Sequence, residues 1–195
     1  MDSTADNLLM FKVRDGDVGK FSFLFERHHR ALFNFFLRLT GNRDLSEDLV
    51  QEVFFRMLKY RHTFRADSQF SAWMYQVARN AYVDHFRKHK HEAVLSDGEE
   101  DDSTSEPSSP ELTPEERLGK RQEACLVRQA LARLSVDKRE VLILSRYQGL
   151  KYEEIANILG CEVGTVKGRV FRAIRDLSEI FFQLSREGSG MSAAG

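Results

Sequence analysis

Residues 64–90, FRADSQFSAWMYQVARNAYVDHFRKHK, bring aromatic rings and cationic side chains together in one short stretch. The rings are Phe64, Phe70, Trp73, Tyr75, Tyr82 and Phe86, and the cations are Arg65, Arg79, Arg87, Lys88 and Lys90. Apolar residues recur at spacings of three and four from Phe70 through Val77 to Ala81. This spacing predicts a helix with one buried face, and Ser68 is a plausible N-cap for it.

Two interpretations of this stretch stay open. Rings among cations form a surface suited to unstacked nucleic-acid bases, each worth about 1–3 kcal/mol of stacking, with the cations on the phosphates. Alternatively, the rings form the core face of an amphipathic helix, and the cations are simply solvated.

The distribution of charge divides the chain into parts. The formal net charge is −1, yet residues 92–116 hold ten acidic residues and no Lys or Arg, so the remainder carries a net charge of +9. This acidic segment also contains all three prolines and few apolar residues, so it cannot bury enough surface to order itself. We therefore expect a domain at 1–91, a flexible linker at 92–114, a second domain at 115–186 and a disordered tail at 187–195. The basic excess of both domains favours a polyanionic partner.

Several function classes are disfavoured. The chain has no apolar run long enough for a membrane span and no signal-peptide pattern, so we expect a cytoplasmic protein without membrane insertion. Cys125 and Cys161 stand apart from each other and from any ligand at metal spacing, and the pair His85 and His89 has no convincing third ligand. No phosphate-binding glycine loop or nucleophile–base set stands out. We expect no metal, no cofactor and no enzymatic activity.

The first domain is predicted to be helical throughout. A helix is predicted over residues 8–39 with a break near residues 16–19, and Thr40-Gly41-Asn42 ends it. A second helix over residues 44–60 starts at Asp44 or Ser46. Its outer face places Phe55 among acidic and amide side chains, which favours a docking surface over a plain solvated face.

The second domain carries a helix-turn-helix pattern. A helix starts at Thr113-Pro114, and another over residues 138–148 turns Val141, Leu142, Leu144 and Tyr147 inward. A short helix at 152–159, a turn at Gly160 and a helix whose inner face is Val163, Val166, Val170 and Ile174 then follow. The outer face of this last helix bears Lys167, Arg169, Arg172 and Arg175. Such a pattern predicts DNA binding through the last helix.

Three blocks carry a family resemblance that covers nearly the whole chain. They are DLVQEVFFRM (48–57), FRADSQFSAWMYQVARNAYVDHFRK (64–88) and REVLILSRYQGLKYEEIANILGCEVGTVKGRVFRAIR (139–175). In this order, with an acidic linker, they resemble a bacterial RNA polymerase sigma factor of the extracytoplasmic-function group. The resemblance implies an all-α protein with two small helical domains. The first would bind the polymerase clamp and the −10 promoter element, and the second the flap and the −35 element, so that the protein supports promoter melting. It also implies an anti-sigma factor as a further partner.

The resemblance also implies roles for individual residues. It places Asp48, Gln51, Glu52, Phe55 and Arg56 on core polymerase. It places Phe64, Arg65, Asp67, Ser68, Phe70, Trp73, Tyr75, Arg79, Asn80, Arg87 and Lys88 on the −10 element, with a flipped base held by the loop at 64–70. It places Thr165, Lys167, Gly168, Arg169 and Arg172, within the helix-turn-helix at 152–174, on the −35 element. Gly168 departs from the serine often found at that position.

Two other functions remain open. A stand-alone DNA-binding regulator would use only the second domain and would bind palindromes without polymerase. A decoy would use a sigma-like surface to sequester an antagonist. The retained cations at Lys167, Arg169 and Arg172 argue against a decoy.

Overall fold

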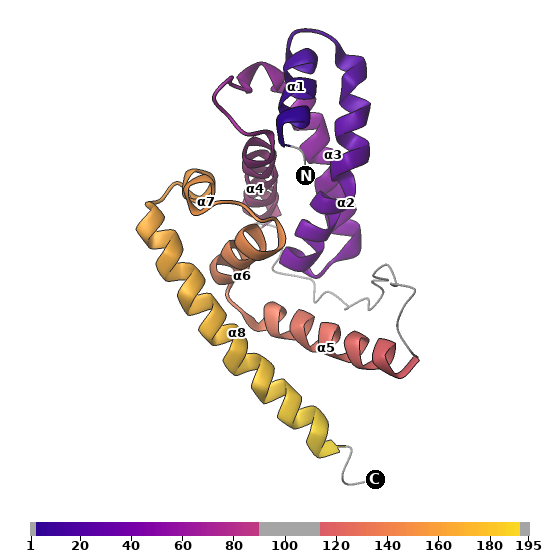
Figure 1. Ribbon diagram of the computed structural model, residues 1–195, viewed down its shortest axis with the longest axis vertical. Coiled ribbons are helices and arrows are strands. Elements are labelled where there is room, and N and C mark those ends of the chain that lie inside the picture. The colour runs from indigo at the N-terminus through magenta and orange to yellow at the C-terminus, as the bar shows by residue number, and fades with distance from the viewer. Residues whose placement is uncertain (1–2, 90–113, 192–195) are drawn as a thin grey trace.

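The computed structural model describes residues 3–89 and 114–191, and all regular elements within these ranges are helical (Figure 1). The all-α fold class predicted from the sequence is therefore confirmed. The predicted linker, apart from Pro114, and the N-cap predicted at Thr113 lie outside the described residues.

The first domain is a helical bundle with an aromatic core. Its elements are α1 (Ser3–Arg14), the 3-10 turn η1 (Val18–Lys20), α2 (Phe21–Thr40), α3 (Arg43–Lys59), the 3-10 turn η2 (Arg61–Thr63) and α4 (Phe70–His89). Helix α3 packs against α2 and α4, and α1 contacts the same two helices. Phe21, Phe35 and Phe36 of α2 are buried in the space between them.

The junction of α2 and α3 follows the predicted stop signal. Gly41 adopts the left-handed conformation at a φ of 74°, and its N–H donates to the carbonyl of Leu37, which closes the last turn of α2. The cap of α3 differs from the prediction. Asn42, rather than Asp44 or Ser46, accepts a hydrogen bond from the N–H of Leu45 at 2.9 Å. Asn42 precedes the helix and has an extended backbone, so its side chain can turn back to the exposed amides of the first turn.

The second domain places a long helix across three shorter ones. Its elements are α5 (Pro114–Arg133), α6 (Val136–Leu142), the π turn η3 (Ile143–Tyr147), α7 (Tyr152–Leu159) and α8 (Val163–Met191). Gly160, at a φ of 63°, makes the predicted turn between α7 and α8. Ile155 and Ile158 of α7 and Val166 and Val170 of α8 are buried between the two helices and their neighbours. Helix α8 extends beyond Arg186, where the sequence analysis placed the start of a disordered tail, and residues 192–195 lie outside the described part.

Two predicted core residues of this domain are exposed instead. Ile174 is 37% exposed, because Ala173 completes the inner face of α8 after Val166 and Val170. Tyr147 is 43% exposed, because the π turn η3 changes the helical register after Leu142. The ring of Tyr147 lies 4.4 Å from the guanidinium carbon of Arg38 in the first domain.

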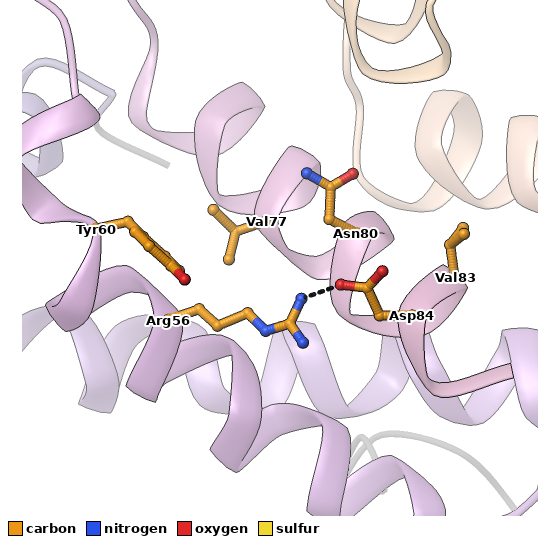
Figure 2. Close-up of a pocket in the computed structure, with 6 residues that line it drawn as sticks. All are labelled: Arg56, Tyr60, Val77, Asn80, Val83 and Asp84. Atoms are coloured by element: carbon orange, nitrogen blue, oxygen red, sulfur yellow. Dashed lines mark hydrogen bonds and ion pairs between the residues drawn. The ribbon is translucent and has the colours of Figure 1, made fainter. Parts of the chain in front are cut away.

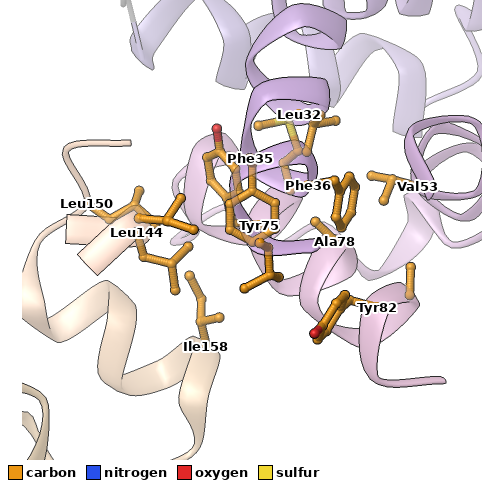
Figure 3. Packing of buried hydrophobic residues seen from close by; sticks show 14 of the residues in the cluster. Leu32, Phe35, Phe36, Val53, Tyr75, Ala78, Tyr82, Leu144, Leu150 and Ile158 are labelled. Carbon is orange, nitrogen blue, oxygen red and sulfur yellow. The ribbon is translucent and has the colours of Figure 1, made fainter. Parts of the chain in front are cut away.

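The two domains share one continuous apolar cluster. Figure 3 shows Leu144, Leu150 and Ile158 of the second domain facing Phe35 and Tyr75 of the first. Helix α4 contacts α7, and α2 contacts α5, α6 and η3. Helix α4 is thus packed by its own bundle on one side and by the second domain on another.

Two glycine substitutions should change stability in opposite directions. Gly41→Ala places a side chain in the left-handed region, so the free energy of unfolding should fall by about 1 kcal/mol. Gly168→Ala lies within α8 at an ordinary φ, where a Cβ would meet only the guanidinium of Arg172 at 3.8 Å, so it should stabilise by about 0.5–1 kcal/mol. Urea unfolding of both variants measures the two changes in the free energy of unfolding. A stabilising Gly41→Ala would contradict the assigned end of α2.

Candidate nucleic-acid interface

The aromatic side chains of residues 64–86 are mostly part of the core. Phe64, Phe70, Trp73, Tyr75 and Tyr82 are all buried, whereas Phe86 is 44% exposed. The core interpretation is therefore correct for five of the six rings, and the expectation of an open aromatic platform is wrong for them. The reason is mutual packing. Phe64 lies against Trp73, with ring centroids 5.4 Å apart, and against Phe11 of α1 at 5.1 Å.

Between these buried rings, the polar residues of the loop are open to solvent. Arg65 and Asp67 are exposed, and their side chains pair at 3.1 Å across a tight turn. Hydrogen bonding between them raises the pKa of Arg65 and lowers that of Asp67, so both stay charged at neutral pH. Ser68 is partly exposed beside them. The loop thus offers charged groups to a ligand and uses its aromatic ends, Phe64 and Phe70, as anchors in the core.

An open groove lies between α3 and α4 (Figure 2). It has a volume of about 390 Å³ and is lined by Arg56, Tyr60, Val77, Asn80, Val83 and Asp84. The Nη1 atom of Arg56 donates to Asp84 at 2.7 Å, which fixes one wall of the groove. The remaining lining combines a 43% exposed Tyr60 ring, two valines and the exposed amide of Asn80. A planar heterocycle with hydrogen-bonding edges fits this chemistry.

The outer face of α3 has the exposure that the sequence predicted. Phe55 is 59% exposed, and Asp48 and Gln51 beside it are exposed as well. Glu52 and Arg56 are partly buried and form an ion pair at 2.6 Å. This face carries a large apolar ring with acidic and amide neighbours, as a protein-docking surface requires.

Further cationic residues lie near the end of α4 and in the first three turns of α8. Arg87 and Lys88 are exposed near the end of α4, and Arg87 pairs with Asp84 at 3.0 Å. In the first turns of α8, Thr165, Lys167 and Arg172 are exposed, and Gly168 and Arg169 are partly buried.

The remaining two predicted DNA-binding residues, Tyr75 and Arg79, are occupied by the second domain. The hydroxyl of Tyr75 donates to the side-chain oxygen of Gln148, and the Nε of Arg79 lies 3.2 Å from a carboxylate oxygen of Glu140. Beside them, Arg139 donates to the backbone carbonyl of Leu39 at 2.7 Å. We call these contacts, together with the apolar contacts of Figure 3, the domain seam.

Glu140 and Gln148 are functional candidates that the sequence analysis missed. Glu140 is 5% exposed and lies one helical turn before Leu144, on the face predicted to be buried. A charged residue in a buried stripe was the available signal. Burial raises the pKa of Glu140, and the nearby charges of Arg79 and Arg169 oppose that shift in part. Burial likewise raises the pKa of Tyr75, so its hydroxyl stays protonated as a donor.

Neither a metal site nor a membrane span is found in the described part of the chain. Residues 3–89 and 114–191 contain no group of three or more His, Cys, Asp or Glu side chains that could hold a metal ion. No described helix has both the length and the apolar character needed to cross a bilayer.

Comparisons with known proteins match both domains. Residues 24–92 match the family described as Sigma-70 region 2, and residues 126–177 match Sigma-70, region 4. The ECF RNA polymerase sigma factor EcfG of Rhodopseudomonas palustris (strain TIE-1) is 35% identical over 160 residues, which cover 82% of this chain and 84% of the relative. The RNA polymerase sigma-H factor of Pseudomonas aeruginosa is 28% identical over 186 residues, which cover 93% of this chain and 96% of the relative.

A solved structure is similar as well. The sigma factor RpoE in its complex with the anti-sigma factor NepR from Bartonella quintana superposes with a TM-score of 0.65 at 31% identity. The match covers 82% of this chain and 95% of the other.

The buried carboxylate of Glu140 predicts a characteristic dependence of stability on pH. Its folded-state pKa lies above the ordinary value of 4.5, so the folded protein binds the proton more tightly than the unfolded chain. The contribution of Glu140 to stability is therefore largest below pH 4.5 and falls as pH rises through the folded-state pKa. We expect the unfolding temperature of the wild type, measured between pH 4 and 8, to fall relative to that of Glu140→Gln as pH rises.

Glu153→Gln, which removes an exposed carboxylate of the neighbouring helix, controls for the loss of one charge. If the unfolding temperature of the wild type instead rises relative to that of Glu140→Gln as pH rises, the ion pair with Arg79 outweighs the cost of desolvation.

Proposed function

Since the chain belongs to the ECF family of RNA polymerase sigma factors, we propose that it binds core polymerase and directs it to promoters through two DNA elements. One observation carries the proposal: a single chain combines a groove suited to one base in its first domain with a cationic helix-turn-helix in its second. Its role would be transcription initiation in the bacterial cytoplasm, with the chemistry left to the polymerase.

The second domain would bind the −35 element through α8. In a helix-turn-helix, the N-terminal part of the second helix enters the major groove. Lys167, Arg169 and Arg172 lie in that part of α8. Arg and Lys read base edges there or bind phosphates. Thr165 lies in the first turn of α8, where the free backbone amides favour a phosphate.

The first domain would bind the −10 element in single-stranded form. The resemblance placed the flipped base in the loop at 64–70, but both rings of that loop are buried. We therefore assign the unstacked base to the groove between α3 and α4, where Tyr60 offers a ring face and Asn80 an amide. The loop at residues 64–70, which we call the −10 loop, would contact the strand with Arg65, Asp67 and Ser68. Each captured base offsets a few kcal/mol of unstacking, so binding energy supports melting without a nucleotide cofactor.

Helix α3 would dock on the polymerase clamp. An exposed aromatic ring at the centre of a polar patch is the usual anchor of a protein interface, and Phe55 has that position between Gln51 and Lys59. The second domain would bind the flap. An anti-sigma factor is a further partner that we propose, since the related RpoE structure is a complex with NepR.

The domain seam would have to open during initiation. Tyr75 and Arg79 are proposed to face the separated strand, yet both contact the second domain. We propose that polymerase and DNA replace these contacts. Each domain alone would bind DNA weakly. Because the two are linked, binding of one raises the effective concentration of the other, so the whole protein would bind tightly.

Run-off transcription tests the proposal. Core polymerase is given a library of randomised promoters with and without this protein, and transcripts that depend on the protein supply a promoter. On that promoter, Arg172→Ala should reduce transcription roughly tenfold, the loss of one base or phosphate contact. Arg175→Ala is the matched control, because Arg175 is already paired with Asp176 at 3.2 Å and lies near Glu179.

A second measurement, the affinity for core polymerase, tests the docking surface on α3. Phe55→Ala should lower the affinity for core polymerase by about tenfold or more, as expected for a central aromatic anchor. Phe23→Ala, which removes a 48% exposed ring from α2, should leave it unchanged. If no transcript depends on the protein while it alone binds palindromic duplex DNA, the stand-alone regulator is the correct function.

A further inference from the structure

Helix α1 holds both ends of the −10 loop, although it precedes the part of the chain that matches Sigma-70 region 2, residues 24–92. At the start of the loop, Nη1 of Arg14 donates to the carbonyl of Phe64 at 3.4 Å, and the ring of Phe11 lies 5.1 Å from that of Phe64. At its end, Oδ1 of Asn7 accepts a hydrogen bond from the N–H of Phe70 at 2.7 Å. Both ends of the exposed part of the loop are therefore fixed by contacts to the same helix.

The contact from Asn7 takes the place of a helix cap. The first amides of a helix have no partner within the helix and need an oxygen from elsewhere. Phe70 is the first residue of α4 and only 1% exposed, so water has little access to its surroundings. Ser68 was the predicted cap, but the oxygen comes from Asn7, 63 positions earlier in the chain. The Nδ2 of Asn7 also lies 3.5 Å from the side-chain oxygen of Gln69.

The preceding residue fixes the position of Asn7. Asp6 is buried, and its two carboxylate oxygens contact Nε2 of His28 at 2.8 Å and Nη1 of Arg27 at 2.7 Å, both on α2. The ring of His28 in turn lies 5.0 Å from that of Phe70. Asp6 thus attaches α1 to α2, and Asn7, next in sequence, attaches α1 to the start of α4.

We propose that Asn7 is a positioning residue for recognition of the −10 element, acting through the −10 loop without contacting DNA. This inference rests on the proposed function, which places the loop on the separated strand. A loop whose two ends are fixed loses less conformational freedom when it captures a ligand, so its affinity is higher. Removing the cap at Phe70 frees one end of the loop and leaves α3, the groove side chains and α8 in place.

Two substitutions at Asn7 separate positioning from packing. Asn7→Ala removes the accepting oxygen, whereas Asn7→Asp keeps an oxygen at the same place. Leu8→Ala alters the next residue of α1, whose side chain is 58% exposed, and serves as the matched control. The affinity of each free variant for core polymerase is measured first. The complex with core polymerase is then tested on two DNA probes from the promoter that the wild type selects, the −35 duplex and a single-stranded oligonucleotide with the −10 sequence. Circular dichroism at the assay temperature verifies that each variant is folded.

Asn7→Ala should weaken binding of the −10 oligonucleotide by roughly three- to tenfold, the equivalent of a lost cap. Asn7→Asp and Leu8→Ala should stay within about twofold of the wild type, and affinities for core polymerase and the −35 duplex should not change. An unchanged −10 affinity in Asn7→Ala, an equal loss in all three affinities, or a failure of Asn7→Asp to restore binding would overturn the inference. A wild type that selects no promoter would instead refute the proposed function.

Discussion

Helix α4 is buried from two directions, and both domains are arranged around it. This helix contributes four buried rings, Phe70, Trp73, Tyr75 and Tyr82, and it also meets the second domain through Tyr75 and Arg79. Proteins seldom leave large apolar surfaces open, so a helix with so many rings needs cover on more than one side. The second domain provides that cover in the described arrangement. A polymerase and a promoter would have to provide it during initiation.

The polar contacts of the seam suit a reversible closure. Arg79 and Glu140 form a largely buried pair, and such pairs add little net stability because each charge loses its hydration. They do specify which surfaces meet. Apolar contacts around Phe35, Leu144 and Leu150 supply the attraction, and the polar groups select the geometry. A seam of this kind can exchange one set of partners for another at modest cost.

Local signals in the sequence were sufficient to predict the helices but not the contacts between them. Gly41 and Gly160 marked helix ends correctly, because their left-handed backbone excludes most other residues. The exposed position of Phe55 also followed from helical spacing. The cap supplied by Asn7 and the pairing of Glu140 with Arg79 could not be predicted, since each depends on segments that are distant in sequence. Nor could spacing alone distinguish rings that stack on bases from rings that fill a core.

A distance between the two domains, measured by pulsed electron paramagnetic resonance, shows whether the seam is closed in the free protein and opens on the polymerase. Spin labels at Glu26→Cys and Glu153→Cys, both exposed in the wild type, report on the two domains once Cys125 and Cys161 are replaced by Ala. We expect one narrow distance distribution in the free protein and a separate, longer one in the complex with core polymerase and promoter DNA. The same distance in both states would mean that the seam does not open during initiation.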